Sequence, residues 1–212
     1  MRICFINPNS TASMTRKIAA AARSAAAPGT EILALTSPSG PPAIQGEADG
    51  RAALPGLLRL IEGNVDEADA FVIACFDDTG LAEARGLTAK PVTGIGEAAF
   101  RTASEGGRRF SVVTTLSVSV PVITANVRAG GFAGTCLRVR ASEVPVLELE
   151  REGSAARETV AAEIGRAIAE DRPEAIVLGC AGMADLAESY TARFGLPVID
   201  GVVAAVRLLQ TR

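Results

Sequence analysis

The chain carries one segment twice, and this repeat sets strict limits on its possible folds. Residues 69–81 (DAFVIACFDDTGL) align without gaps to residues 174–186 (EAIVLGCAGMADL), and the alignment places one cysteine on another. Upstream, residues 2–11 (RICFINPNST) correspond to residues 109–118 (RFSVVTTLSV), and a Pro-Val pair follows each cysteine segment. A repeat with a period near half the chain predicts a molecule made of two similar units.

Each unit has the sequence pattern of an α/β protein. Short apolar runs rich in Val and Ile alternate with Ala-rich stretches of helical character, as in βαβ units around a parallel sheet. We therefore predict two similar lobes related by a pseudo-two-fold axis, each a mainly parallel sheet flanked by helices, with the active site in the cleft between them. One helix is expected from about Thr11 to Ala26, with Ser10 or Thr11 as its N-cap. The expected strands are Arg2–Ile6, Glu31–Leu35, Ala70–Ala74, Val92–Gly94, Phe110–Thr114, Leu137–Ala141, Ala175–Leu178 and Val198–Ile199.

The two aligned cysteines, Cys75 and Cys180, each follow an apolar strand and stand beside small or polar turn residues. A single free cysteine in such a place is usually a small buried hydrophobe. Two at equivalent positions favour a functional interpretation, because ligands of open parallel sheets bind beyond the carboxyl ends of the strands. The repeat thus predicts opposed thiols in a shared cleft. Cys4, inside the first strand, and Cys136, without an equivalent partner, are predicted to be structural.

Opposed thiols suit the inversion of a carbon acid. One group must remove a proton from one face of the stereocentre, and another must return a proton to the opposite face. A thiol, with an ordinary pKa of about 8.5, can do this where amides or a helix N-terminus lower that pKa. Each cysteine immediately precedes an expected helix start. Backbone amides of residues 76–79 and 181–183 are expected to stabilise a thiolate and an enolate oxygen.

The composition argues against several other kinds of chemistry and partner. The chain has no histidine, which excludes Cys₂His₂ and Cys₃His zinc sites and a Cys-His dyad. Neither Lys17 nor Lys90 is placed to hold pyridoxal phosphate. We expect no metal, no cofactor, and reduced thiols rather than disulfides. A net charge of −3, scattered basic residues and the lack of a long apolar run argue against nucleic-acid and membrane partners. The N-terminal apolar run breaks at Asn7-Pro8, too early for a signal peptide, so we predict a cytoplasmic protein.

Two further motifs have competing interpretations. Residues 94–99 (GIGEAA) resemble the dinucleotide fingerprint with Ala for the last Gly. No acidic residue ends a following strand about 20 residues on, so a nicotinamide site is disfavoured and a tight turn that lines the cleft is favoured. Asp77 and Asp78 are either solvated turn residues or pocket residues. Because a carboxylate raises the pKa of a neighbouring thiol, at least one of them is expected to point away from it.

The expected substrate-binding residues lie at the strand exits and turns around the two cysteines. Residues 7–11 (NPNST) make an ordinary helix-capping turn, but they leave the first strand on the cleft side, as the hydroxyl cluster after Phe110–Thr114 does in the second unit. The full set is Asn9, Ser10, Phe76, Asp78, Thr79, Gly94, Ile95, Thr114, Thr115, Ser117, Ala181 and Gly182.

At these residues the sequence resembles the hydantoin and allantoin racemases of the aspartate/glutamate racemase superfamily. The matching motifs span nearly the full chain: NPNST at 7–11, ACFDDTG at 74–80, SVVTT at 111–115 and LGCAGM at 178–183. The resemblance implies a cofactor-free racemase that uses both cysteines on a small molecule, a 5-substituted hydantoin or allantoin, and that assembles into homo-oligomers.

The resemblance also implies that the last helix crosses back to the first lobe. One lobe would then comprise residues 1–96 plus 201–212, and the other residues 97–200.

Two alternatives stay open. Other members of the superfamily racemise aspartate or glutamate or isomerise maleate, and such substrates need a cationic group, whereas no arginine lies in the motifs above. A small-molecule binding protein that keeps the two-lobed cleft without its chemistry is the non-enzymatic alternative.

Overall fold

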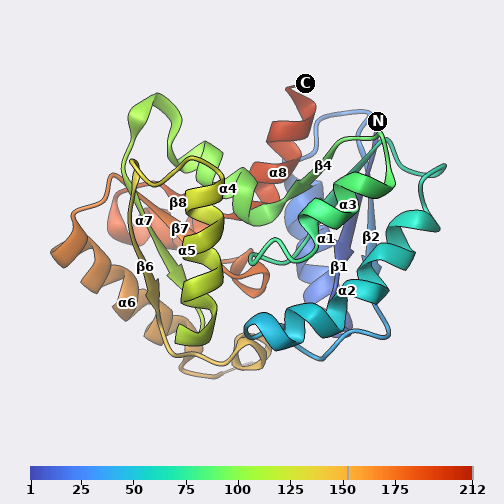
Figure 1. The fold of residues 1–212 in the computed structure, drawn as a ribbon. Helices are drawn as coiled ribbons and strands as arrows, with labels where there is room; N and C mark the ends of the chain where they lie inside the picture. Colours follow the sequence, from blue (N-terminus) through green and yellow to red (C-terminus); the bar gives the residue numbers. More distant parts are fainter. Residues whose placement is uncertain (152, 212) are drawn as a thin grey trace.

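Two parallel four-stranded sheets stand side by side in this protein (Figure 1). The structure is a computed structural model that describes residues 1–151 and 153–211. The first sheet has the order β2-β1-β3-β4 and the second the order β6-β5-β7-β8. The strands are β1 (Arg2–Asn7), β2 (Glu31–Thr36), β3 (Ala70–Ile73), β4 (Val92–Gly94), β5 (Phe110–Thr114), β6 (Cys136–Ala141), β7 (Ala175–Gly179) and β8 (Val198–Ile199).

The two sheets repeat one topology, which confirms the predicted α/β class and the repeat. β1 and β3 lie side by side in the first sheet, and β5 and β7 hold the same places in the second. Ile6 pairs with Ile73, and Thr114 pairs with Gly179, so each pair of neighbouring strands ends at the same level. All eight strands lie where the sequence predicted them, with ends that differ by one residue at most.

Helices cover both faces of each sheet. α2 and α3 pack on the outer face of the first sheet and α6 and α7 on that of the second, while α1, α4 and α8 contribute to a core that both sheets share. The α-helices are α1 (Ala12–Ala25), α2 (Glu47–Glu62), α3 (Leu81–Leu87), α4 (Ile95–Ala103), α5 (Val120–Ala129), α6 (Ala156–Asp171), α7 (Ala187–Phe194) and α8 (Gly201–Gln210). Short 3₁₀ helices are η1 (Glu105–Gly107), η2 (Ser117–Ser119), η3 (Val146–Glu150) and η4 (Ala181–Met183).

The shared core holds the two lobes together. Apolar residues of β1 and β5 belong to one buried cluster with those of α1, α4 and α8. Phe100 of α4 lies between Phe76 and Phe110, with ring centroids 5.5 and 6.0 Å apart, so it joins one lobe to the other. Each such fully buried ring contributes about 1.5–3 kcal/mol of transfer free energy. The site between the lobes is therefore built on a rigid support.

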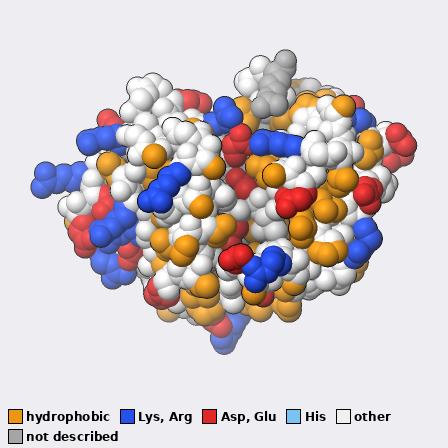
Figure 2. All heavy atoms as spheres, in the orientation of Figure 1, with side chains coloured by type: hydrophobic (Ala, Val, Ile, Leu, Met, Phe, Trp, Pro, Cys, Tyr) orange, Lys and Arg blue, Asp and Glu red, His pale blue; other side chains and the backbone are white. Residues whose placement is uncertain are grey.

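The last helix, α8, packs against α1 of the first lobe and against α4. The contact with α1 agrees with the predicted return of the chain, whereas the division into residues 1–96 plus 201–212 and residues 97–200 stays a prediction, and residue 212 lies outside the described residues. Within the described ranges, no helix is long and apolar enough to cross a membrane. Figure 2 shows charged side chains of both signs dispersed over the drawn face of both lobes.

The start of α1 differs in detail from the prediction. Thr11 occupies the N-cap position, but its hydroxyl donates to the Pro42 carbonyl at 2.6 Å and does not cap the helix. The Asn9 side chain instead accepts the Thr11 amide at 2.9 Å. The expected N-cap position of Thr11 is therefore confirmed, although its hydroxyl does not cap the helix and Asn9, two residues earlier, accepts the Thr11 amide. This places Asn9 between the helix and the cleft.

Candidate active site

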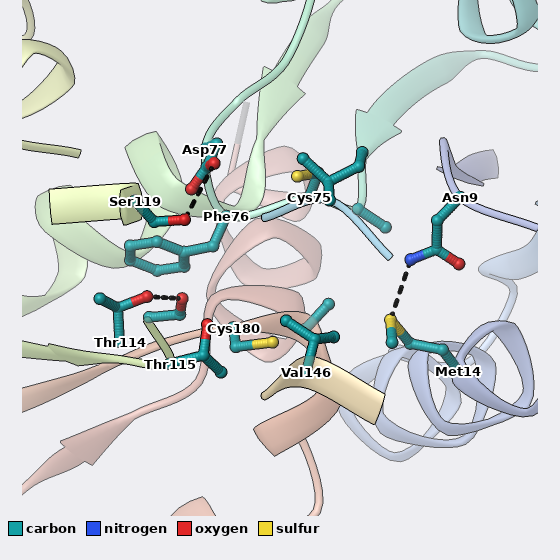
Figure 3. Close-up of a pocket in the computed structure, with 14 residues that line it drawn as sticks. Asn9, Met14, Cys75, Phe76, Asp77, Thr114, Thr115, Ser119, Val146 and Cys180 are labelled. Carbon is teal, nitrogen blue, oxygen red and sulfur yellow. Dashed lines mark hydrogen bonds between the residues drawn. The ribbon is translucent and has the colours of Figure 1, made fainter. Parts of the chain in front are cut away.

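A cavity lies between the two lobes, at the carboxyl ends of β1, β3, β5 and β7, and both predicted thiols line it (Figure 3). Cys75 comes from the first lobe and Cys180 from the second, on opposite sides of the cavity. The cavity is narrow, with a volume of about 30 Å³. The predicted residues Asn9, Phe76, Thr114, Thr115 and Ala181 also line it.

Cys75 sits on an extended turn that follows β3. The Thr79 hydroxyl donates to its Sγ at 3.6 Å. Burial raises the pKa of the Cys75 thiol, and the Asp77 charge raises it further, while the Thr79 hydroxyl and the Asp77 amide act in the opposite direction. The next helix, α3, begins only at Leu81. The expectation of a helix start immediately after this cysteine is therefore wrong, because residues 76–80 form turns first.

Cys180 has the environment that was expected of both cysteines. It directly follows β7 and is the N-cap of η4, where its Sγ accepts the Gly182 amide at 3.4 Å. The pKa of the Cys180 thiol is raised to about 12, mainly by burial. The Gly182 amide acts to lower this pKa, and the Asp77 charge acts to raise it. The pKa of both thiols therefore responds to the same carboxylate, which must lie near both.

That carboxylate, Asp77, lines the same cavity as the two thiols. Ser119 donates to its Oδ2 at 3.4 Å, and the Asn126 side chain donates to its backbone carbonyl at 2.8 Å. Both partners belong to the second lobe, so Asp77 reaches across the cleft (Figure 3). Burial raises the pKa of Asp77 to about 7.

The neighbouring carboxylate, Asp78, points away from the cavity, as one of the pair was expected to do. It accepts the amides of Gly96 and Glu97 at 2.9 and 2.8 Å and thereby caps α4. A Cβ on Gly94 would lie 1.9 Å from its Oδ1, so the glycine leaves room for this cap. The turn that resembles a dinucleotide fingerprint thus directs its helix N-terminus at a carboxylate of the chain itself, which leaves no room there for a phosphate.

Several predicted binding residues do not reach the cavity wall. Asp78 and Gly94 form the cap just described, and Ile95 is buried in the core. The Ser10 amide donates to the Pro41 carbonyl. The exposed Ser117 hydroxyl lies 3.5 Å from Glu143 Oε2. Thr79 and Gly182 contact the thiols without lining the cavity. The sequence placed all of these residues near the correct strand ends but could not show which way each side chain points.

The cavity also contains residues that the sequence did not single out. Met14, Ile44 and Val146 supply an apolar wall from α1, from the loop before α2, and from η3. The side-chain Nδ2 of Asn9 donates to Met14 Sδ at 3.1 Å. Ser119 was missed although it lies two residues beyond the expected Ser117. Its signal in the sequence was its place in the hydroxyl-rich run that follows Phe110–Thr114.

Other candidate groups do not converge on the cavity. In residues 1–151 and 153–211 there is no group of three or more Cys, Asp or Glu side chains arranged to hold a metal ion. Cys4 is fully buried, in agreement with the structural role predicted for it, and Cys136 begins β6 outside the cavity wall. The chemistry available in the cavity thus comes from two thiols, one carboxylate, and the hydroxyl and amide groups around them.

Comparison with known proteins agrees with this geometry. Residues 3–209 match the family described as Asp/Glu/Hydantoin racemase. A hydantoin racemase of Rhizobium meliloti is 46% identical over 99% of this chain and 88% of its own length. One of Pseudomonas sp. is 43% identical over 100% of this chain and 85% of its own.

A solved structure extends the agreement to the fold. The allantoin racemase from Klebsiella pneumoniae superposes with a TM-score of 0.96 at 45% identity, over 100% of this chain and 86% of that one. The resemblance read from the motifs is confirmed: the chain belongs to the Asp/Glu/Hydantoin racemase family and is an enzyme of the isomerase class.

Proposed function

We propose that the protein racemises a hydantoin-type cyclic ureide at C5, using Cys75 and Cys180 as the two acid/base groups. The observation that carries the proposal is the position of the two thiols on opposite sides of one small cavity. The substrate class is drawn from the similar proteins named as hydantoin and allantoin racemases. In such a ring the C5 hydrogen lies between a carbonyl and a nitrogen, so the carbanion is delocalised onto the carbonyl oxygen.

The proton transfers follow from this arrangement. The thiolate on one side takes the C5 proton, the C–H electron pair moves into an enolate, and the thiol on the other side gives its proton to the opposite face. After turnover the two cysteines have exchanged protonation states, ready for the mirror-image substrate. Because burial raises the pKa of both thiols, the Thr79 hydroxyl and the Gly182 amide are needed to stabilise whichever one is ionised.

Hydrogen-bond donors near the cavity have distinct tasks. Thr114 Oγ1 already donates to the Gly179 carbonyl at 2.8 Å, which fixes the strand end beside Cys180. Thr115 and the second N–H of the Asn9 side chain, beside the one that points at Met14 Sδ, are the polar groups for the ring carbonyls and the enolate oxygen. We propose them, with Phe76 and Ala181, as the substrate contacts.

Solvent isotope exchange tests the proposal. In D₂O, either enantiomer of a 5-substituted hydantoin is expected to gain deuterium at C5 while its optical rotation decays. Cys75→Ser and Cys180→Ser should each slow racemisation by about 1,000-fold, since a serine hydroxyl is a far weaker acid. Cys136→Ser, outside the cavity, is the matched control and should retain the parent rate. Racemisation at the parent rate in both cavity variants would refute the two-thiol mechanism.

The predicted oligomeric state and cellular location remain proposals. Assembly into a homo-oligomer and residence in the cytoplasm are still expected, and analytical ultracentrifugation and cell fractionation would test them.

The acidic-substrate alternative receives no support from the site, because none of the described residues that line the cavity is Lys or Arg.

A further inference from the structure

A single carboxylate, Asp77, shares the cavity wall with both thiols and lacks a cationic partner there. The Ser119 hydroxyl donates to its side chain at the long distance of 3.4 Å. Within the described part of the wall, no Lys or Arg balances its charge. Lys17, whose charge is felt at Cys180, is held by the Glu150 carboxylate at 2.8 Å and the Leu149 carbonyl at 3.0 Å. Apart from the two thiols, Asp77 is therefore the one acidic or basic side chain in the described part of the wall.

The carboxylate has no evident task in stabilising the thiols. Asp77 and Gly182 hold equivalent positions, two residues after Cys75 and Cys180. In both lobes the backbone amide at this position lowers the pKa of the cysteine, so a glycine is sufficient for it. The Asp77 side chain has the opposite effect and raises the pKa of both thiols. A buried charge with these costs needs another reason to be there.

Ligand recognition supplies that reason. A cyclic ureide is uncharged and carries one ring N–H next to C5, and a carboxylate is the strongest side-chain acceptor for it. An amino acid or dicarboxylate would bring a negative charge close to Asp77 without any cation to offset it, and like charges side by side weaken binding by several kcal/mol. One residue thus favours the first ligand class and disfavours the second.

We propose that Asp77 is a specificity-determining residue that accepts a ring N–H of a neutral ureide and excludes substrates with a carboxylate near the reacting carbon. This inference rests on the proposed function for the identity of the ring. It assigns Asp77 to ligand selection, separate from the proton transfers of the two thiols.

The test compares two ligands that differ in charge but little in size. 5-Propylhydantoin and hydantoin-5-acetate share the ring, and only the second carries a carboxylate. Equilibrium binding at pH 8, measured by calorimetry, should show the parent protein preferring the neutral ligand by roughly 100-fold. Asp77→Asn should reduce this preference to below roughly 10-fold and weaken 5-propylhydantoin itself by about 10-fold, through loss of a charge-assisted hydrogen bond.

Three variants isolate the role of the charge. Asp77→Glu keeps the carboxylate and should keep most of the preference. Asp77→Ser removes the carboxylate by a different side chain and should behave like Asp77→Asn, which guards against a folding defect in either one. Asp78→Asn makes the same change one residue along, on the side chain that caps α4. It should lower the melting temperature while the preference for the neutral ligand stays that of the parent.

The possible results separate this inference from the proposed function. An unchanged preference in Asp77→Asn, or parent protein that binds hydantoin-5-acetate as tightly as 5-propylhydantoin, overturns the role of Asp77, even if deuterium enters the hydantoin. A preference that depends on Asp77, without any deuterium entry at C5, supports the role of Asp77 and overturns the racemisation instead.

Discussion

The exits of β3 and β7 are equivalent in the repeat and differ in how they treat their cysteines. After β7 the chain enters η4 at once, and Cys180 Sγ accepts the Gly182 backbone amide. After β3 it makes an extended turn, and Cys75 Sγ accepts the Thr79 hydroxyl from a side chain. The residue two positions beyond the cysteine is Gly182 in one lobe and Asp77 in the other.

This difference separates what the reaction needs from what the ligand needs. The proposed racemisation uses two thiols on opposite sides of the cavity, and the equivalent strand exits of the two lobes place them there. The ureide ring proposed as substrate has no matching symmetry, because a nitrogen lies on one side of C5 and a carbonyl on the other. An asymmetric carboxylate can therefore be added to one lobe without disturbing the placement of the thiols. The following predictions test how far the two exits are independent, beginning with the largest effect.

The residue immediately before each cysteine should not be interchangeable between the lobes. Ala74 precedes Cys75, whereas Gly179 precedes Cys180 and lies against Thr114. A Cβ on Gly179 would come within 2.7 Å of Thr114 Cβ and 2.9 Å of its Cα. Gly179→Ala is therefore expected to lower the free energy of unfolding by about 3 kcal/mol. The reciprocal change, Ala74→Gly, should cost only about 1 kcal/mol. Urea denaturation measures both, and equal losses would mean that the two exits are packed alike.

The Asp77 carboxylate should destabilise the folded protein, with a definite pH dependence. Its pKa is about 7 in the folded state, against about 3.9 in an unfolded chain. The folded state thus binds this proton more tightly, and stability falls as the pH rises from about 4 through about 7. Asp77→Asn should raise the free energy of unfolding by about 2 kcal/mol at pH 8, with no gain at pH 4. A gain of equal size at both pH values would show that packing, and not charge, is responsible.

The fold was predictable to a large extent because its signals are local. Short Val- and Ile-rich runs bounded by turn residues predicted all eight strands, and the repeat predicted that the two sheets share one topology. The cysteines were predictable for the same reason, since each ends such a run. Parallel sheets then bring strand ends together whatever the loops do.

The remaining part of the site depends on side-chain direction, which the repeat does not encode. Asp77 and Asp78 are adjacent and chemically identical, yet one lines the cavity and the other caps α4, because Asp78 adopts a left-handed backbone with φ 49°. Met14, Ile44 and Val146 enter the cavity from a helix and two connecting segments that lie far from the cysteines in sequence. Only the tertiary structure places them there.

The side-chain donor at Cys75 should be removable, unlike the backbone donor at Cys180. Thr79→Val keeps the shape of the residue and deletes the hydroxyl that donates to Cys75 Sγ. The pKa of the Cys75 thiol should rise by about one unit and kcat/KM should fall about 10-fold. Both enantiomers have the same free energy, so kcat/KM must fall equally in both directions. Thr159→Val, on the exposed side of α6, is the control. A parent-like rate in Thr79→Val would mean that the Asp77 amide alone is sufficient.

The smallest expected difference is in the reactivity of the two thiols toward an alkylating agent. At Cys75 the Asp77 charge is the second largest cause of the raised pKa, after burial. At Cys180 the Gly182 amide, which lowers the pKa, has a larger effect than the Asp77 charge, which raises it. Cys180 should therefore be the more acidic thiol. A difference of about one pKa unit gives about 10-fold more thiolate, but a more acidic thiolate is also a weaker nucleophile, so the expected rate ratio is only about 3-fold.

Iodoacetamide labelling at pH 8, followed by peptide mass spectrometry, measures this ratio, with Cys136 as an internal reference outside the cavity. In Asp77→Asn both cavity thiols should react faster, because a nearby negative charge no longer raises their pKa values. Cys75 should gain more than Cys180, and the ratio should move toward one. If Cys136 accelerated to the same extent, the change would reflect general loosening of the protein. If the ratio stayed fixed while only the cavity thiols accelerated, Asp77 would act equally on both exits, and the asymmetry between the lobes would have to come from the Thr79 and Gly182 donors alone.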